Sequence, residues 1–308
     1  MATAQQPMRG VFPPLITPLS TSRQLDACGL ERLIEYILAG GVNGLFILGT
    51  TGEAPALSYA LREEVIERTC RQARGRVPVM VGVSDTSAAE SIRLAKKAAE
   101  AGADYVVVAA PYYFPASQAE IGDYIARIAA ESPLPVMLYN APSNTGTVLE
   151  PPTVLRLADL PNVVGLKDSG FNMIYFHKLV WLLRDRPEFT LLVGPEELTA
   201  EAVLLGGHGG MCGGSNFCPK LYVDLYRAAA AGNLEEVNRL QRRVIEISAT
   251  VYNVAPGEPS SYLRGLKCAV SLIGLCGDTL AEPVAPFSPA QREEVRRRMV
   301  AAGLLEAR

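Results

Sequence analysis

Short apolar runs alternate with longer amphipathic stretches from the N-terminus to about residue 216. Each apolar run ends in small, polar, glycine or proline residues, a pattern typical of repeated β-α units. Eight such runs predict strands over 11–16, 44–48, 77–81, 105–109, 135–139, 163–167, 190–193 and 209–212. The intervening segments have apolar residues at three- and four-residue spacing and predict helices over 28–38, 59–73, 88–101, 118–130, 151–158, 174–183 and 196–205.

The predicted strands show little polar alternation, which suits a parallel sheet covered by helices. Eight successive units predict closure into an α/β fold of the (β/α)8 TIM-barrel type. An open, doubly wound sheet is the alternative. Its glycine-rich dinucleotide turn would follow the first strand, whereas residues 13–18 of this chain are PPLITP. The pattern therefore favours the barrel.

The alternation of strands and helices stops after Asn216. Helical spacing of apolar residues continues over 220–231, 234–251, 261–273 and 289–302. We interpret the first of these helices as the last helix of the barrel and the others as a small bundle. The expected organisation is a barrel domain over residues 1–230 and a C-terminal helical domain over residues 231–308.

The charge and hydropathy of the chain argue against two classes of partner, nucleic acids and membranes. The chain carries 29 lysine and arginine residues against 32 aspartate and glutamate residues, and its longest basic run covers residues 296–298. This balance does not suggest a nucleic acid partner. The N-terminal residues lack an apolar signal-peptide core, and no uninterrupted apolar stretch reaches about 18 residues. We therefore expect a cytoplasmic protein without a membrane partner.

Cysteine and histidine residues give little support to a metal site. The six cysteines include no CxxC pair, so neither a zinc site nor a disulfide framework is expected. The two histidines, His177 and His208, lie in different segments. A catalytic metal centre is therefore disfavoured.

Barrel enzymes carry their working groups at the C-terminal ends of the strands, which directs attention to Lys167. This lysine follows the apolar residues 163–166. Apolar surroundings favour the uncharged amine, which can attack a carbonyl carbon as a nucleophile. The neighbouring Asp168 points to the opposite face of the strand and need not pair with the amine. The alternative is that Lys167 extends from the strand end into solvent.

Tyr139 ends the preceding strand, after the apolar residues 135–138. A phenol at this place could transfer protons to and from a carbinolamine or the hydroxyl at a bond being cleaved. A lone tyrosine at a strand end more often serves packing. Tyr139 and Lys167 end adjacent predicted strands, however, and are expected to reach one substrate together.

Three further segments follow predicted strands or contain many glycines. Residues 49–53 are GTTGE, whose backbone N–H groups and hydroxyls suit a carboxylate. Residues 111–113 are PYY and offer a second tyrosine for a hydroxyl relay. Residues 206–210 are GGHGG and allow close approach of backbone to a ligand, but no GKS or GKT follows, so a phosphate-binding P-loop is not expected.

Taken in order, these segments resemble the dihydrodipicolinate synthase / N-acetylneuraminate lyase family of pyruvate-dependent class I aldolases. The resemblance covers nearly the whole chain. The matching segments are PLITP at 14–18, GTTGE at 49–53, PYY at 111–113, YNAPSNTG at 139–146, GLKD at 165–168 and GGHG at 206–209.

The resemblance implies a role for each matching residue. Lys167 is similar to the lysine that forms the Schiff base, and Tyr139 to the tyrosine that transfers protons. Thr50 and Tyr113 would complete the catalytic hydroxyl relay, with Tyr113 arriving from a neighbouring subunit. The family is usually a dimer of dimers, so a homo-oligomer is expected. No metal or organic cofactor is implied, because the substrate is held covalently on Lys167.

The implied substrate-binding residues are Thr51, Gly49, Asn144 and Met211. The hydroxyl and N–H of Thr51 would hold the carboxylate of a 2-oxo acid such as pyruvate, and Met211 would bring a backbone carbonyl near the pocket. Asn144 stands where biosynthetic members carry an arginine for the far carboxylate of aspartate semialdehyde. An amide cannot supply that charged, bidentate contact.

This departure favours a Schiff-base lyase that cleaves or dehydrates a 4-hydroxy-2-oxo acid or a 2-keto-3-deoxy sugar acid. The alternative is a 4-hydroxy-tetrahydrodipicolinate (dihydrodipicolinate) synthase that uses another residue for the distal carboxylate. A catalytically inactive barrel kept as a binding or regulatory protein is more remote, because Lys167, Tyr139, Thr50 and Tyr113 occur together. A metal-dependent aldolase is disfavoured by the two separated histidines.

Overall fold

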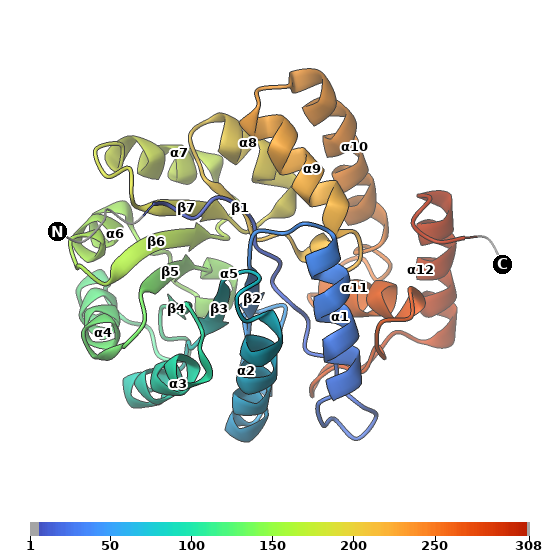
Figure 1. Cartoon of the computed structure of the whole chain (residues 1–308), viewed down its shortest axis with the longest axis horizontal. Helices are drawn as coiled ribbons and strands as arrows, with labels where there is room; N and C mark the ends of the chain where they lie inside the picture. Colours follow the sequence, from blue (N-terminus) through green and yellow to red (C-terminus); the bar gives the residue numbers. More distant parts are fainter. Residues whose placement is uncertain (1–5, 307–308) are drawn as a thin grey trace.

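Eight short parallel strands form one curled sheet at the centre of the molecule (Figure 1). The computed structural model describes residues 6–306. Neighbouring strands pair in the order β1-β8-β7-β6-β5-β4-β3-β2. The strands are β1 (Gly10–Val11), β2 (Leu45–Ile47), β3 (Val79–Gly82), β4 (Tyr105–Ala109), β5 (Val136–Asn140), β6 (Val163–Asp168), β7 (Thr190–Val193) and β8 (Gly209–Gly210).

The sheet closes between its first and second strands. Pro14 forms a parallel bridge with Phe46, and the N–H of Leu15 donates to the carbonyl of Phe46 at 2.8 Å. The predicted barrel is therefore confirmed, and the open doubly wound sheet is wrong. The predicted first strand, 11–16, is too long: regular pairing ends at Val11, because Pro13 and Pro14 have no N–H to donate to a strand ladder.

Helices follow the strands and cover the outside of the barrel, as the apolar spacing predicted. Most begin at a serine, aspartate or asparagine whose side chain accepts a backbone N–H of the first turn, as Asp26, Ser58, Ser87, Ser117 and Asn172 do. They are α1 (Ala27–Ala39), α2 (Tyr59–Ala73), α3 (Ala88–Ala101), α4 (Gln118–Glu131), α6 (Pro151–Ala158), α7 (Met173–Leu182), α8 (Thr199–Leu204) and α9 (Pro219–Ala230).

Four short helical turns, three of which the sequence did not predict, follow strands at the carboxyl edge of the sheet. They are η1 (Ala54–Ala56), α5 (Pro142–Thr145), η2 (Glu196–Leu198) and η3 (Gly213–Asn216). The predicted helix 196–205 is two elements, η2 and then α8. These turns line the edge where working groups of a barrel gather.

Inward-pointing side chains fill the barrel and leave one basic group at its carboxyl end. The inner cluster includes Phe46 of β2, Met80 of β3 and Leu192 of β7, all buried. Tyr139 of β5 lies in register with Lys167 of β6, which in turn pairs with Leu192. Paired residues of adjacent strands point to the same face, so Lys167 points into the barrel.

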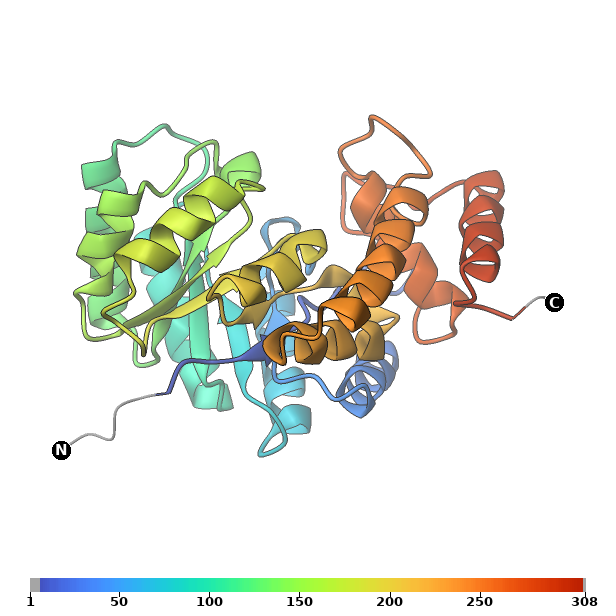
Figure 2. The same ribbon diagram turned by 90° about the horizontal axis from the view of Figure 1, so that it is seen from above.

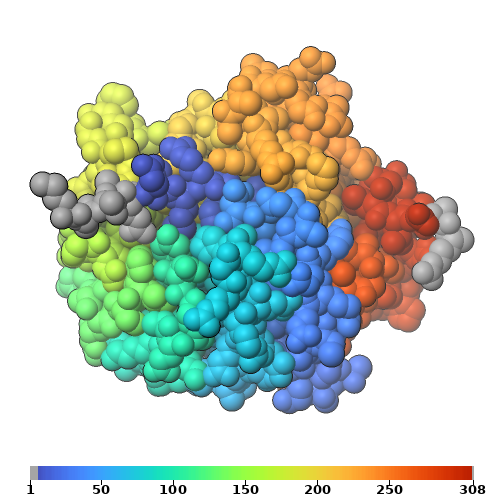
Figure 3. All heavy atoms as spheres, in the orientation of Figure 1, coloured from blue at the N-terminus to red at the C-terminus, as the bar shows by residue number. Residues whose placement is uncertain are grey.

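The remaining chain forms the C-terminal helices, α10 (Leu234–Thr250), α11 (Ser261–Leu272) and α12 (Pro289–Ala301). They lie on one side of the barrel (Figure 2), and in the space-filling view of Figure 3 their atoms form the right and upper right flank, next to the blue atoms of α1. No helix among residues 6–306 is both long and apolar enough to cross a membrane.

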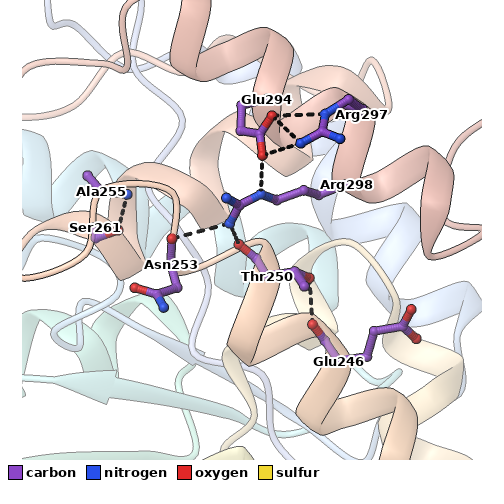
Figure 4. Close-up of polar contacts among 8 residues, drawn as sticks. All are labelled: Glu246, Thr250, Asn253, Ala255, Ser261, Glu294, Arg297 and Arg298. Atoms are coloured by element: carbon purple, nitrogen blue, oxygen red, sulfur yellow. Dashed lines mark hydrogen bonds and ion pairs between the residues drawn. The ribbon is translucent and has the colours of Figure 1, made fainter.

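Arg298 of α12 holds the end of α10 in place (Figure 4). Its guanidinium donates to the carbonyls of Thr250 at 2.8 Å and Asn253 at 3.2 Å, and it also donates to Glu294. Ser261 accepts the N–H of Ala255 at 3.2 Å. These contacts fix the loop between α10 and α11, which faces the carboxyl end of the barrel.

Candidate active site

Two adjoining cavities open at the carboxyl end of the barrel. The main cavity, of about 540 Å³, lies between the strand ends and the C-terminal helices and contains Lys167, Thr51 and Met211. The adjoining cavity, of about 430 Å³, is lined by Gly49 and Tyr112, among others. The two cavities share Thr50, Tyr139, Ser143 and Asn144. Seven of the eight predicted site residues therefore line this space.

Lys167 is buried, with 4 % of its surface exposed. Its Nζ lies 4.4 Å from the ring centroid of Tyr139 and 4.9 Å from that of Phe46. Asp168 points to the other face, where it accepts hydrogen bonds from Asn140 Nδ2 at 2.7 Å and the N–H of Gly170 at 2.9 Å. These contacts agree with the expectation that Asp168 need not pair with the amine. The alternative that Lys167 extends into solvent is wrong.

Tyr139 is the acid–base group whose ring packs against this amine. Its hydroxyl lies 3.2 Å from Thr50 Oγ1. Burial by itself raises the pKa of Tyr139, but the positive charge of Lys167 and the surrounding hydrogen bonds outweigh burial, so the pKa lies below its ordinary value. A phenol of this kind gives up its proton more readily than a free tyrosine.

Asn144 contacts Thr50. Its Nδ2 donates to Thr50 Oγ1 at 2.8 Å. Because the Thr50 oxygen accepts from Asn144, the proton of the Thr50 hydroxyl is free to point at the Tyr139 oxygen. Asn144, Thr50 and Tyr139 thus form a chain of hydrogen bonds that ends beside Lys167.

The loop 49–53 after β2 is held in a tight turn. Leu48, just before the loop, and Glu53, its last residue, have positive φ angles of 57° and 58°. Thr17 Oγ1 donates to the carbonyl of Gly52 at 2.7 Å. Thr51 is buried, and its Oγ1 lies 3.4 Å from the hydroxyl of Tyr262. The turn therefore presents two adjacent threonine hydroxyls to the cavities.

The glycine-rich segment 206–210 has a structural use. Gly209 has a φ of 152°, and a Cβ built there would come within 1.9 Å of the Gly10 carbonyl oxygen. Glycine therefore lets β8 approach β1. Met211, the next residue but one, is 1 % exposed and donates its N–H to the Val193 carbonyl at 2.8 Å, at the wall of the main cavity.

Tyr113 does not join the other predicted catalytic residues within one chain. It is 83 % exposed, and its ring packs edge-on against Phe114 with 5.0 Å between centroids. Its neighbour Tyr112 lines the adjoining cavity instead. The predicted role of Tyr113 requires a second subunit.

The part of the chain that the structure describes offers no set of side chains for a metal centre. Residues 6–306 contain no group of three or more histidine, cysteine, aspartate or glutamate side chains placed to hold an ion. All six cysteines are free thiols.

Comparison with known proteins identifies the family. The model of the dihydrodipicolinate synthetase family matches residues 7–302. The chain belongs to this family. Dihydrodipicolinate synthetase family members are pyruvate-dependent class I lyases, and this protein is accordingly a lyase of the Schiff-base type.

Individual members of the dihydrodipicolinate synthetase family resemble the chain over nearly its full length. The 4-hydroxy-tetrahydrodipicolinate synthase of Neisseria gonorrhoeae is 33 % identical over 97 % of this chain and 100 % of its own. The structure of a dihydrodipicolinate synthase from Bacteroides thetaiotaomicron is 49 % identical, with a TM-score of 0.93 over 96 % of this chain and 99 % of that one. YagE, an E. coli prophage protein of the family crystallised with pyruvate, is 30 % identical, with a TM-score of 0.91 over 96 % and 99 %.

In this family member, the main cavity also contains acidic and aromatic groups that the sequence did not indicate. Glu196 is 4 % exposed and accepts hydrogen bonds from the hydroxyls of Tyr222 at 2.6 Å and Tyr252 at 2.9 Å and from the N–H of Gly214 at 2.7 Å. Burial raises the pKa of Glu196 to about 7, although these donors oppose the shift. Glu196 lies shortly after β7, and this position could have marked it as a site residue. The apolar spacing instead placed it in the predicted helix 196–205.

The C-terminal helices contribute two of the missed residues. Tyr252 follows α10 and Tyr262 lies in α11, and both line the main cavity. Their rings meet edge-on with 4.9 Å between centroids. No local pattern marks either tyrosine, because only the packing of α10 and α11 against the barrel brings them to Thr51 and Glu196.

Proposed function

We propose that Lys167 forms the Schiff base of this lyase with pyruvate or a closely related 2-oxo acid. The observation that carries the proposal is the buried amine of Lys167 beside the ring of Tyr139, at the carboxyl end of the barrel. Support also comes from YagE, whose structure contains pyruvate. The Thr51 hydroxyl and backbone N–H are suited to the carboxylate of the 2-oxo acid.

The proposed reaction begins when the Lys167 amine adds to the C2 carbonyl. Tyr139 donates a proton to the departing hydroxyl of the carbinolamine, which leaves as water and gives the protonated imine. The Tyr139 phenolate then takes a proton from C3, or takes the proton of the C4 hydroxyl as the C3–C4 bond is cleaved, and the electron pair is left in an enamine. Thr50, with Tyr113 of a neighbouring subunit, would connect Tyr139 to solvent. These steps need no metal or organic cofactor.

The first candidate for the overall reaction is 4-hydroxy-tetrahydrodipicolinate synthase, in which the enamine attacks aspartate semialdehyde. The names of the similar proteins favour this reaction over the cleavage or dehydration expected from Asn144. Attack of the enamine on the aldehyde is the reverse of aldol cleavage and uses the same groups.

Cleavage or dehydration of a 4-hydroxy-2-oxo acid or a 2-keto-3-deoxy sugar acid remains the second candidate. One observation favours it: among the described residues that line the two cavities, Lys167 is the only lysine or arginine, while Glu196 and Glu197 are both present. A second carboxylate on the substrate would lack a cationic partner there, whereas hydroxyl groups could donate to these carboxylates.

Trapping tests the Schiff base. Incubation with pyruvate and borohydride is expected to give a reduced adduct that peptide mapping locates on Lys167 and that Lys167→Ala lacks. A full-length chain that forms no adduct with any 2-oxo acid would overturn the proposal and favour an inactive binding protein. An adduct that forms equally well in EDTA would exclude a metal-dependent aldolase.

Coupled assays separate the two candidate reactions. A synthase consumes pyruvate with aspartate semialdehyde, whereas the second candidate releases pyruvate or a dehydrated product from 4-hydroxy-2-oxo acids or 2-keto-3-deoxy sugar acids. The synthase candidate fails if only the second group of compounds is turned over, and the second candidate fails in the opposite case.

A further inference from the structure

A buried ion pair joins the loop 49–53 to the C-terminal helices. Glu53 Oε1 lies 2.5 Å from Lys267 Nζ, and the side chains are 4 % and 0 % exposed. Glu53 ends the turn that carries Thr50 and Thr51, whereas Lys267 belongs to α11, more than two hundred residues later in the chain. Neither residue lines the two cavities, and the proposed chemistry uses neither.

Each member of the pair is fixed by a further hydrogen bond. Glu53 Oε2 accepts the N–H of Ala281 at 2.8 Å, and Lys267 Nζ donates to the carbonyl of Thr279 at 2.7 Å. Glu53 Oε1 has no hydrogen-bond partner of good geometry, so the contact with the ammonium compensates its charge. Burial lowers the pKa of Lys267, and the nearby carboxylate opposes this effect. Each buried charge is therefore stabilised by the other.

Buried ion pairs are poor stabilisers, because desolvation of the two charges offsets most of their attraction. The presence of this ion pair is therefore not explained by stability, and its surroundings suggest another role. The N–H of Glu53 donates to the carbonyl of Thr50 at 3.0 Å. The backbone of Thr50 is thus hydrogen-bonded directly to Glu53, the partner of Lys267. The Thr50 hydroxyl in turn contacts Tyr139.

A second contact with α11 reaches the same loop. The hydroxyl of Tyr262 lies 3.4 Å from Thr51 Oγ1, so one helix contacts the loop at Thr51 and at Glu53. Glu53 also adopts a positive φ of 58°, a conformation that costs a non-glycine residue energy and persists where surrounding contacts impose it. The ion pair is one such contact.

We propose that Glu53 and Lys267 are positioning residues of the lyase, whose buried ion pair fixes the loop 49–53 so that the Thr50 hydroxyl reaches Tyr139. The inference rests on the proposed relay of Thr50 and Tyr139. It assigns the C-terminal helices a part in proton transfer that goes beyond enclosing the cavity.

Proton transfer is measured without any second substrate by the exchange of pyruvate methyl protons for deuterium, followed by NMR. The decisive variant is Glu53→Gln combined with Lys267→Met, which removes both charges and leaves neither buried alone. It is expected to have a Tm near that of the parent protein and an exchange rate about 10- to 100-fold lower, because small displacements of catalytic groups have effects of this size. The yield of the borohydride adduct on Lys167, trapped after imine formation has reached equilibrium, should stay unchanged.

Two further variants separate positioning from general loss of stability. Val295→Ala truncates a buried residue of α12, and it should lower the Tm while leaving the exchange rate of the parent. Glu53→Asp keeps the charge but withdraws the carboxylate by one methylene, so it remains informative if the double variant does not fold, and its exchange should also be slowed.

Wild-type exchange in the double variant, or in Glu53→Asp where the double variant does not fold, would overturn the inference. A parent protein that forms no adduct with pyruvate would instead overturn the proposed function, so the two failures are distinguishable.

Discussion

Asn144 donates a hydrogen bond to Thr50, with 2.8 Å between Nδ2 and Oγ1. The amide predicted to contact substrate therefore also contacts a residue of the proposed relay. This geometry links substrate choice to proton transfer, since any residue at position 144 that binds the substrate differently also changes the surroundings of Thr50.

Removing the Asn144 amide is expected to slow proton transfer. In Asn144→Ala, the Thr50 hydroxyl loses the hydrogen-bond donor that holds it within reach of Tyr139. Loss of one hydrogen bond of this kind, about 1 kcal/mol, corresponds to a roughly fivefold lower rate of pyruvate methyl exchange. Ser143→Ala is the matched control, because Ser143 lines the same cavities. Equal effects of the two substitutions would show that the Asn144–Thr50 contact has no special role.

Replacing Tyr139 with phenylalanine keeps the ring that packs against Lys167 and removes only the hydroxyl. We expect kcat to fall by about 10²- to 10⁴-fold, the usual contribution of a general acid–base group, with little change in Tm. The lowered pKa of Tyr139 also predicts that the exchange rate of the parent rises with pH through a transition below the ordinary pKa of tyrosine. That transition should be absent from the pH profile of Tyr139→Phe; a profile shared by both proteins would assign it to another group.

Glu196 makes the stability of the fold depend on pH. Its pKa is raised from 4.5 to about 7 by burial, so between these values the folded protein binds more protons than the unfolded chain. Stability is then full below about pH 4.5 and falls as pH rises through about 7. The total change is on the order of 3 kcal/mol, from about 1.4 kcal/mol for each pH unit.

Urea unfolding at pH 5 and pH 8 tests this dependence. Glu196→Gln cannot ionise and should lose less stability between the two pH values than the parent does. Glu197→Gln, at the neighbouring cavity residue, removes a charge that adds to the raised pKa of Glu196, so it should reduce the pH dependence of stability less than Glu196→Gln does. An unchanged dependence in Glu196→Gln would mean that Glu196 does not titrate in this range.

The sequence predicted most of the fold because the barrel repeats a local pattern. Helices α2, α3 and α6 begin and end at the predicted residues, since their signals are local: apolar spacing within each helix, an N-capping serine just before α2 and α3, and proline in the first turn of α6. The first strand was predicted too long because apolar character alone does not record the missing N–H groups of Pro13 and Pro14.

The site was predictable where residues follow strands and unpredictable where they meet through packing. Tyr139 and Lys167 lie at the ends of strands and Thr50 follows one, and the barrel brings strand ends together. Tyr262 and Lys267 reach the loop 49–53 from α11. Their position depends on how the C-terminal helices pack against the barrel, which no local spacing encodes.

The predicted role of Tyr113 can be tested by mixing two inactive variants. Tyr113 is 83 % exposed, so its hydroxyl is available to a neighbouring subunit. Tyr113→Phe and Lys167→Ala are each expected to abolish or strongly reduce turnover. In a mixed oligomer, the site with an intact Lys167 receives an intact Tyr113 from the Lys167→Ala subunit, and the reciprocal site contains both defects.

Co-expression, or dissociation and reassembly, of the two variants should therefore restore activity well above the sum of the separate proteins. Tyr112→Phe mixed with Lys167→Ala serves as the control, because Tyr112 lines the cavity of its own chain and its defect stays with the intact lysine. If mixing Tyr113→Phe with Lys167→Ala restores nothing although mixed oligomers form, Tyr113 does not complete the site of its neighbour, and the relay must end within one subunit at Thr50.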